Sequence, residues 1–557
     1  MVSRKQLALI LPAALFAASI TIAVTPALTA SDAGAGAPKA VRKFYADDPL
    51  LREPAPRPVR HVEPRKVDDI YDFLKNMYVT PRQEGKENKR GPHPAANTNT
   101  LDEVPDNSWY TNRHYFHRMS VEELERGPGN STPPVPNGAW RITSAKSDGV
   151  TPGFVIEDER KNRYLLKFDP PQYPELCSGP DVIGSKIFYA LGFNTPENYI
   201  VHFRREQLQV SDGVMYRHPS GKKTPLSDDV VDELLQAQRK GPDGTYRALA
   251  SRWVEGRPVG PFSYEGTRSD DPNDIVPHQD RRELRGLRVF AAWLNHQDTR
   301  SINSMDTLVS ENGIPYLKHY LLDFGSILGS AGVGPKMAWY GHEYVIERKA
   351  AAIQMVTLGV YPPSWARSEY RNFTGTGMLD YKSFDPASWK PSYPNPAFLL
   401  TDREDAFWGA KQVAAFTDDE IRALVKAGEY SDPRTADWIT ECLIQRRDKI
   451  ADFAFARVLP LDKFRVKDGE LAFDDLFSGR RPGPSRLYQV HWAKYDQQGH
   501  FTPLPKDVGR KIPAVTGTEY LAATIQCAAG LEPPCPDPVT VYVRHSGAAL
   551  QVVGVDR

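Results

Sequence analysis

Three side chains that could serve a metal ion and a nucleophile lie in the stretch from Leu294 to Gly325, LNHQDTRSINSMDTLVSENGIPYLKHYLLDFG. Asn303 lies five positions after Asp298, and Asp323 opens an Asp-Phe-Gly sequence. Carboxylate and amide oxygens are the ligands that hard divalent cations prefer. A nearby carboxylate can also orient or deprotonate a hydroxyl nucleophile. These residue types are ones that phosphate chemistry could use, since there a protein mainly positions groups and neutralises charge.

The surrounding pattern predicts the elements that position these residues. Residues 280–295 (DRRELRGLRVFAAWLN) form an amphipathic helix that leads to Asp298. Two short strands, separated by the turn Glu-Asn-Gly, then place Asp323 just past the second strand. Further upstream, from Trp140, the runs WRITSAK, GFVIED and RYLLKFDP read as hairpin-linked strands, and PDVIGSKIFYALG reads as a helix that ends at Gly192.

This order of strands, helix, strands, helix, Asp-x4-Asn loop and Asp-Phe-Gly resembles the protein-kinase-like fold over about residues 138 to 460. The resemblance implies an α+β fold of two lobes, with a β-rich N-lobe and a helical C-lobe. It also implies ATP and Mg²⁺ or Mn²⁺ as cofactors, and phosphate transfer to a hydroxyl group. The acceptor stays open between a protein, a polysaccharide, a lipid and a small molecule.

Residue roles follow from the resemblance position by position. Lys167, the charged residue within the apolar run RYLLKFDP, would contact the α- and β-phosphates; a solvated lysine on an edge strand is the alternative. Asp298 would position the attacking hydroxyl, and Asn303 and Asp323 would bind the metal ion. Gly149 and Gly153, in the turn SDGVTPG, stand where a glycine-rich loop would cover the phosphates, although a plain β-turn explains them equally.

The chain departs from the usual kinase pattern at two places. The helix VIGSKIFYALG has no Glu to pair with Lys167, so Asp181 at its start and Glu175 just before it are the candidate partners. The residue before Asp298 is Gln297, where ordinary kinases have Arg. The absence of this Arg, the segment LGFNTPENYIV and a secretory signal at the N-terminus, described next, look more like the HipA-type, CotH spore-coat and secretory-pathway kinases.

The N-terminus predicts export. Arg4 and Lys5 precede an apolar run from Leu7 to about Val24 and then small residues, which is the order of a secretory signal peptide; an uncleaved membrane anchor is the alternative. We therefore expect a secreted or periplasmic bacterial protein with no membrane span in the mature chain. Lys plus Arg and Asp plus Glu both number 70, so no basic field favours nucleic acid as a partner.

Sequence patterns, together with the kinase-like resemblance for the two lobes, predict five regions: a signal peptide (1–35), a Pro-rich extended arm with one helix (36–137), a kinase-like N-lobe (138–265), a kinase-like C-lobe (266–463) and a small β-rich C-terminal domain (464–557). The four cysteines show no metal-ligand spacing. Cys527 and Cys535 could close a small disulfide loop in an oxidising compartment, or could be unrelated thiols.

Two other functions remain open on the sequence. The same residues would serve a pseudokinase or an enzyme that transfers AMP in place of phosphate. The 10 Trp and 25 Tyr residues and the β-rich C-terminus also fit a non-catalytic envelope or carbohydrate-binding protein, because exposed aromatic rings stack on sugars. Large domains also need such aromatics in their cores.

Overall fold

The structure is a computed structural model of the whole chain. It describes residues 41–82, 93–129, 133–146, 153–218, 221–478, 480, 486–504, 509–528, 535–546 and 549–557.

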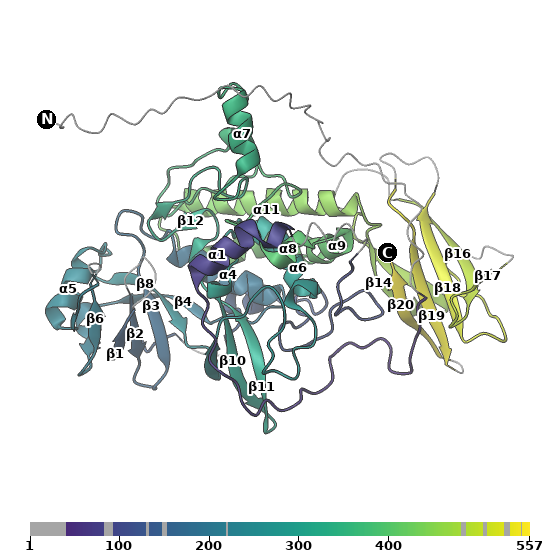
Figure 1. Cartoon of the computed structure of the whole chain (residues 1–557), viewed down its shortest axis with the longest axis horizontal. Helices are drawn as coiled ribbons and strands as arrows, with labels where there is room; N and C mark the ends of the chain where they lie inside the picture. The colour runs from purple at the N-terminus through teal and green to yellow at the C-terminus, as the bar shows by residue number, and fades with distance from the viewer. Residues whose placement is uncertain are drawn as a thin grey trace, which may run out of the picture.

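The N-lobe is built on a six-stranded sheet, at the left of Figure 1. Its strand order is β4-β8-β3-β2-β1-β5, and every neighbouring pair is antiparallel except β1 with β5. Apolar residues of these strands, among them Trp140, Phe154 and Leu166, pack into one core. The strands are β1 (Trp140–Ala145), β2 (Gly153–Glu157), β3 (Arg163–Lys167), β4 (Asn198–Phe203), β5 (Leu208–Val210) and β8 (Tyr246–Arg252).

Helix α4 (Ser178–Ala190) joins the two lobes. It packs against β4 and β8 on one side and against the short helix η5 (Phe324–Ser326) on the other. Every residue of α4 except Tyr189 is buried as a result. Between β4 and β8 the chain also forms η2 (Arg205–Gln207), β6 (Met215–Arg217), β7 (Lys223–Pro225) and α5 (Asp228–Gln236).

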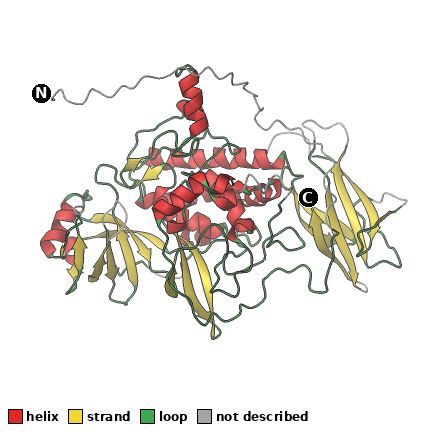
Figure 2. Ribbon diagram, in the orientation of Figure 1, coloured by secondary structure: helices red, strands yellow, loops and turns green. Residues whose placement is uncertain are grey.

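The C-lobe is mainly helical and has the largest core (Figure 2). Helix α6 lies inside it and packs against α8, α9 and α11, because apolar residues such as Leu287, Phe290 and Trp293 cover most of its surface. Its helices are η3 (His278–Asp280), α6 (Arg282–Leu294), α8 (Pro396–Leu399), α9 (Arg403–Ala414), α10 (Asp418–Lys426) and α11 (Pro433–Phe455).

A three-stranded sheet of order β11-β10-β9 carries the chain from α6 to the Asp-Phe-Gly sequence. Strands β10 (Ser304–Glu311) and β11 (Ile314–Leu321) pair in a hairpin whose register sets Ser304 opposite Leu321. Strand β9 (Arg257–Gly260) pairs with β10. Strand β9 thus belongs to the same sheet as β10 and β11.

The segment after η5 forms β12 (Ser330–Ala331), β13 (Gly334–Pro335), α7 (Arg348–Val356) and η6 (Ser364–Arg367). Helix α7 stands away from the rest of the fold, at the top of Figure 1.

The N-terminal arm runs over both the C-lobe and the C-terminal sheet. Its backbone donates hydrogen bonds from Val59 N to Pro315 O and from Arg65 N to Val259 O, both 2.8 Å long. Its Trp109 and Tyr110 enter the C-lobe core, while its Phe44 packs on the C-terminal sheet. The arm contains the helices α1 (Asp69–Tyr78) and α3 (Val121–Arg126).

A β domain with its own core ends the chain. It consists of a hairpin, which begins at Leu461, and an antiparallel five-stranded sheet of order β17-β16-β18-β19-β20. A disulfide joins Cys527 to Cys535. The strands are β14 (Leu461–Lys467), β15 (Glu470–Asp475), β16 (Tyr488–Tyr495), β17 (Phe501–Pro503), β18 (Tyr520–Cys527), β19 (Val539–Ser546) and β20 (Ala549–Asp556).

The fold is thus α+β with two lobes, a β-rich N-lobe and a helical C-lobe, as the kinase-like resemblance implied. Within the described residues, no helix combines the length and the apolar character needed to cross a membrane.

Candidate active site

Lys167, the last residue of β3, lies between two carboxylates. Its Nζ is 3.1 Å from Asp181 Oδ2 and 2.9 Å from Asp323 Oδ1, and 16 % of its side chain is exposed. Burial disfavours the ammonium, but the two carboxylates outweigh burial and hold the pKa of Lys167 above its usual value. The lysine is therefore a fixed cation that faces the Asp-Phe-Gly sequence and not a solvated edge residue.

Asp181 is the buried centre of this arrangement, with 2 % of its side chain exposed. Besides the contact with Lys167, it accepts hydrogen bonds from Phe324 N at 3.1 Å and from Asn198 Nδ2 at 2.8 Å. Burial raises the pKa of Asp181 and Lys167 opposes that shift. All three donors favour the ionised carboxylate. Asp181 thus joins β3, α4, β4 and the Asp-Phe-Gly sequence at one point.

Gly184 explains how an Asp can take the place of the longer Glu. A Cβ added at Gly184 would lie 2.5 Å from Cβ of Phe324, so only glycine permits the observed approach of α4 to η5. The ring of Phe324 also stacks on Phe188 of α4, with centroids 5.0 Å apart. This close packing makes up for the methylene that Asp181 lacks.

Glu175, the other candidate partner, does not reach Lys167. Its carboxylate accepts a hydrogen bond from Ser431 N at 2.9 Å, and its backbone has a φ of 68°. The left-handed turn at Glu175 directs the side chain toward the C-lobe. Between the two acids proposed from the sequence, the structure pairs Lys167 with Asp181.

Asp323 has a φ of 59°, which is uncommon for a residue with a side chain. Its side chain is 53 % exposed although one oxygen contacts Lys167. The charge of Lys167 lowers the pKa of Asp323, so this carboxylate is anionic at neutral pH. The carboxylate can bind a cation on its exposed side.

Asn303 and Asp298 lie next to Asp323 because of the β10-β11 register. Leu322 N donates to Asn303 O at 2.9 Å, and Asn303 Nδ2 donates to Asp298 O at 2.8 Å. The second bond fixes the amide and leaves Oδ1 as the atom available to a cation. Asp298, Asn303 and Asp323, which the sequence placed in one site, are therefore neighbours.

Asp298 pairs with Arg300, which is also 2.9 Å from Asp69 of the arm helix α1. Burial raises the pKa of Asp298, but Arg300 and Lys336 outweigh it and lower the pKa. The carboxylate is thus kept ionised and can accept a hydrogen bond from a hydroxyl group. Sequence analysis did not assign Arg300 to the site.

Two more lysines face the site and were missed. Lys146 follows β1; burial and the charge of Lys167 lower its pKa, and Asp323 and Asp181 oppose that shift. Lys336 follows β13 and donates from Nζ to Ser326 O at 3.1 Å; burial lowers its pKa to about 8 despite the opposing charge of Asp298. Lys146 stands in a polar turn and Lys336 in a loop, so neither carries a sequence signal.

Of the two glycines proposed to cover the phosphates, the structure describes one. Gly149 lies outside the described residues. A Cβ at Gly153 would lie 2.3 Å from Leu166 O, so the pairing of β2 with β3 requires this glycine. Gly153 O also accepts the backbone hydrogen bond of Lys146 N at 2.9 Å, which places that lysine over the site.

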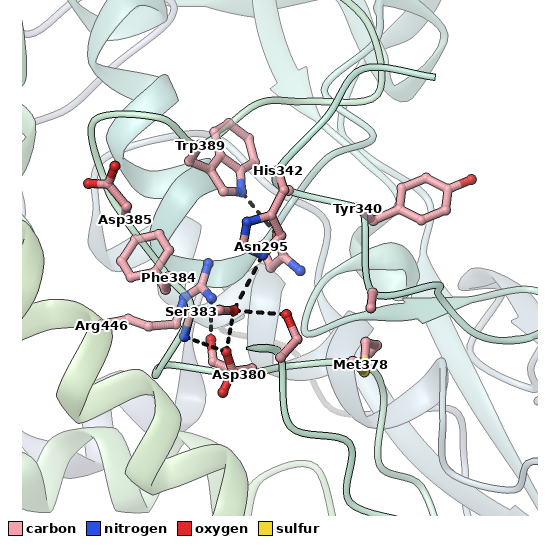
Figure 3. A pocket seen from close by; sticks show the side chains of 13 residues that line it. Asn295, Tyr340, His342, Met378, Asp380, Ser383, Phe384, Asp385, Trp389 and Arg446 are labelled. Atoms are coloured by element: carbon pink, nitrogen blue, oxygen red, sulfur yellow. Dashed lines mark hydrogen bonds between the residues drawn. The ribbon is translucent and has the colours of Figure 1, made fainter. Parts of the chain in front are cut away.

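A cavity of about 20 Å³ is lined by Asn295, the residue that caps the end of α6 (Figure 3). It has room for about one water molecule and is too small for a substrate. His342, Ser383 and Asp380 line it, but Asp380 bonds to Ser383 and not to His342, which is not the order of a hydrolase triad. Arg446 donates to Ala292 O, Trp293 O and Asp380 O and so fixes the end of α6.

The donor set fits a divalent cation that is shared with phosphates. Asp323 and Asn303 offer two hard oxygen ligands, and nucleotide oxygens and water would complete the shell. No group of three or more His, Cys, Asp or Glu side chains that could hold a metal occurs among the described residues. A metal bound without a nucleotide would therefore have few protein ligands here.

Comparisons with known proteins identify kinases among solved structures. No protein-family model matches the chain, and no curated protein matches it. The structure of the Helicobacter pylori proinflammatory kinase CtkA is similar with a TM-score of 0.31 at 10 % identity, covering 58 % of this chain and 97 % of that one. The Golgi casein kinase is similar with a TM-score of 0.26 at 9 % identity, covering 72 % and 96 %. The Golgi casein kinase with Mn/ADP bound has a TM-score of 0.28 at 11 % identity, covering 71 % and 94 %.

Proposed function

We propose that this protein is an ATP-dependent phosphotransferase of the atypical kinase type, which uses Mg²⁺ or Mn²⁺ and acts on a hydroxyl group. The observation that carries the proposal is the position of Lys167 Nζ between Asp181 and Asp323. An ammonium held beside the first residue of an Asp-Phe-Gly sequence is where a nucleotide's phosphates need both a cation and a metal ligand.

The residues of the site divide into three roles. Lys167 and Lys146 supply positive charge for the α- and β-phosphates. Asp323 and Asn303 would hold the metal ion, which when bound neutralises phosphate charge and orients the transferred group. Asp298 orients the acceptor hydroxyl.

Asp298 is suited to orientation because Arg300 and Lys336 keep it ionised. An ionised carboxylate accepts the hydroxyl hydrogen bond and fixes the direction of attack. Phosphoryl transfer needs little more from a base, since its transition state is loose and bond formation to the acceptor comes late.

The compartment and the acceptor extend the same proposal. We place the protein outside the cytoplasm, as a secreted or periplasmic enzyme, on the strength of its N-terminal sequence and of Cys527 and Cys535, whose disulfide fits an oxidising compartment. The acceptor is a hydroxyl of a protein, a polysaccharide, a lipid or a small molecule.

Mass spectrometry of products tests the reaction. The purified chain with ATP and Mg²⁺ or Mn²⁺ should release ADP and add the mass of a phosphate to an acceptor or to itself. Asp298→Asn should keep ATP binding and lose turnover by about 100-fold or more, because the lost contact belongs to the transfer step. Glu311→Gln, on the far end of the β10-β11 hairpin, is the matched control and should keep full turnover.

The other outcomes assign other functions. An added AMP with release of pyrophosphate would identify a nucleotidyl transferase on the same fold. Metal-dependent ATP binding without any product would identify a pseudokinase. A chain that binds no nucleotide would favour a non-catalytic envelope or carbohydrate-binding protein, and would refute the proposal.

A further inference from the structure

Helix α7 (Arg348–Val356) is unusual because none of its residues is buried. Its C-terminal half and the loop that follows expose large apolar side chains: Met355 by 77 %, Val356 by 81 %, Leu358 by 90 %, Val360 by 84 % and Tyr361 by 66 %. We call these five residues the α7 tip. Apolar helices of soluble proteins normally bury at least one face, so the α7 tip requires a partner.

The α7 tip carries no charged side chain, and basic side chains flank it at the base of the helix. Residues 350–366 contain no charged side chain. Lys349 precedes this stretch and Arg367 follows it, and both are exposed and form no ion pair with any described residue. Arg348 beside them packs over the ring of Tyr78. An apolar end with a basic collar is the pattern of a segment that enters a membrane interface above anionic headgroups.

Three hydrogen bonds pair polar groups in and beside the α7 tip with one another. Gln354 Nε2 donates to Tyr361 O at 2.9 Å, and Thr357 Oγ1 donates to Ile353 O at 2.8 Å. Gly359 N donates to Gln354 O at 3.0 Å and closes the helix end. Apolar surroundings penalise unsatisfied polar groups, so this internal pairing prepares the tip for hydrocarbon.

The shape of the tip favours a lipid surface over a protein groove. Apolar side chains stand on the helix and on the returning loop, whereas a protein groove would contact one helical stripe. From Lys349 to Val356 the helix rises about 10 Å, which matches the depth of about 5–10 Å that interfacial segments reach. Figure 1 shows α7 clear of the other described elements, so none of these elements obstructs the insertion.

We propose that the α7 tip docks the protein onto an anionic lipid bilayer, with the apolar residues in the interface and Lys349 and Arg367 at the headgroups. The base of α7 is tied to the candidate active site, since Val345 N donates to Ser392 O and Ser392 N donates to Gln297 O, beside Asp298. Docking would therefore hold the site in a fixed orientation to the membrane. The membrane contact itself does not depend on the proposed function.

Vesicle co-sedimentation of the full chain tests the docking. The protein should bind vesicles of phosphatidylcholine mixed with phosphatidylglycerol and bind pure phosphatidylcholine vesicles less. Val356→Glu with Leu358→Glu should weaken binding by more than about tenfold. The matched control, Ile275→Glu with Leu487→Glu, adds the same charge at two residues exposed by 73 % and 70 % elsewhere and should bind like the parent. Lys349→Gln should weaken binding to the anionic vesicles about fivefold.

Three results would overturn the proposal: no binding to either vesicle, equal loss in the tip and control variants, or equal binding to neutral and anionic vesicles. A concentration-dependent dimer that the tip variant abolishes, without vesicle binding, would assign the tip to a second copy of the chain. ATP binding by the tip variant should be unchanged in the absence of vesicles, which separates failure of this proposal from failure of the nucleotide site.

Discussion

A methyl group added at Gly184 tests whether the close approach of α4 holds Lys167 in place. In Gly184→Ala the new Cβ would lie 2.5 Å from Cβ of Phe324 and 2.8 Å from Cδ1 of Ile327. Non-bonded carbon atoms prefer about 3.5–4.0 Å. Helix α4 and η5 must therefore separate by about 1 Å, and the 3.1 Å contact of Lys167 with Asp181 stretches beyond hydrogen-bond length.

Stability and binding should respond differently to this change. Overpacking costs about 1–3 kcal/mol, whereas Ala in place of Gly within a helix returns about 1 kcal/mol. The lost hydrogen bond between Lys167 and Asp181 adds about 1.5–3 kcal/mol, so the free energy of unfolding should fall by about 2–5 kcal/mol. Lys167 is then no longer held toward the phosphates, and the affinity for Mg-ATP should fall about 10- to 100-fold.

Isothermal titration calorimetry and thermal melting measure the two effects. Gly286→Ala is the matched control, because its Cβ would also lie 2.5 Å from a neighbour, Cε3 of Trp408, in the interior of the C-lobe. It should lose stability and keep ATP affinity. Adding Asp181→Glu to Gly184→Ala should restore affinity, since the longer side chain spans the widened gap. Unchanged ATP affinity in Gly184→Ala, or an equal loss in Gly286→Ala, would refute the reasoning.

Three further predictions concern other parts of the chain. Lys336→Met should lower turnover about tenfold or more at unchanged ATP affinity, because it removes a cation that lowers the pKa of Asp298. An equal loss of ATP affinity would contradict this prediction. Burial lowers the pKa of His114 to about 4, so the unfolded state binds more protons between about pH 4 and 6.5, and stability decreases as the pH is lowered through that window. His114→Gln should flatten this fall, by up to about 3 kcal/mol in urea unfolding, and an unchanged slope would count against a neutral buried His114. Cys527→Ser should destabilise the C-terminal sheet by about 2–3 kcal/mol, and a loss of ATP binding would show that the sheet and the kinase-like lobes are coupled.

The order of elements could be predicted from the sequence because each carries its own periodicity and turn residues. The three strands from Trp140, the α4 helix and the Asp298 to Asp323 hairpin all occur where the patterns placed them. The spacing of Asp298, Asn303 and Asp323 is local, so the register of one hairpin suffices to bring them together.

Contacts between distant segments could not be predicted in this way. Asp181 lies in the first turn of α4 and Glu175 just before the helix, and the left-handed turn at Glu175 directs its side chain elsewhere. The importance of Gly184 depends on how closely α4 packs on Phe324, which is a tertiary property. Arg300 was passed over because its second partner, Asp69, belongs to an arm more than two hundred residues away in the sequence.

The partner of strand β9 and the positions of two lysines could not be predicted for the same reason. Strand β9 reads as a continuation of the N-lobe strands, yet it pairs with β10, because strand partners are chosen by long-range packing. Lys146 and Lys336 lie in turns whose sequences are typical of solvated loops. Their positions at the site follow from the paths of β1 and β13, which composition does not encode.

Binding of Mg-ATP or Mn-ATP to the parent protein and to Asp323→Ala tests the central claim most directly. The side chain of Asp323 is half exposed, and its contact described above is with Lys167. Removing the Asp323 carboxylate should therefore leave the fold intact. We predict that the metal-nucleotide complex raises the melting temperature of the parent and has no measurable effect on Asp323→Ala. Equal stabilisation of both proteins, or none of the parent, would contradict the assignment of the site.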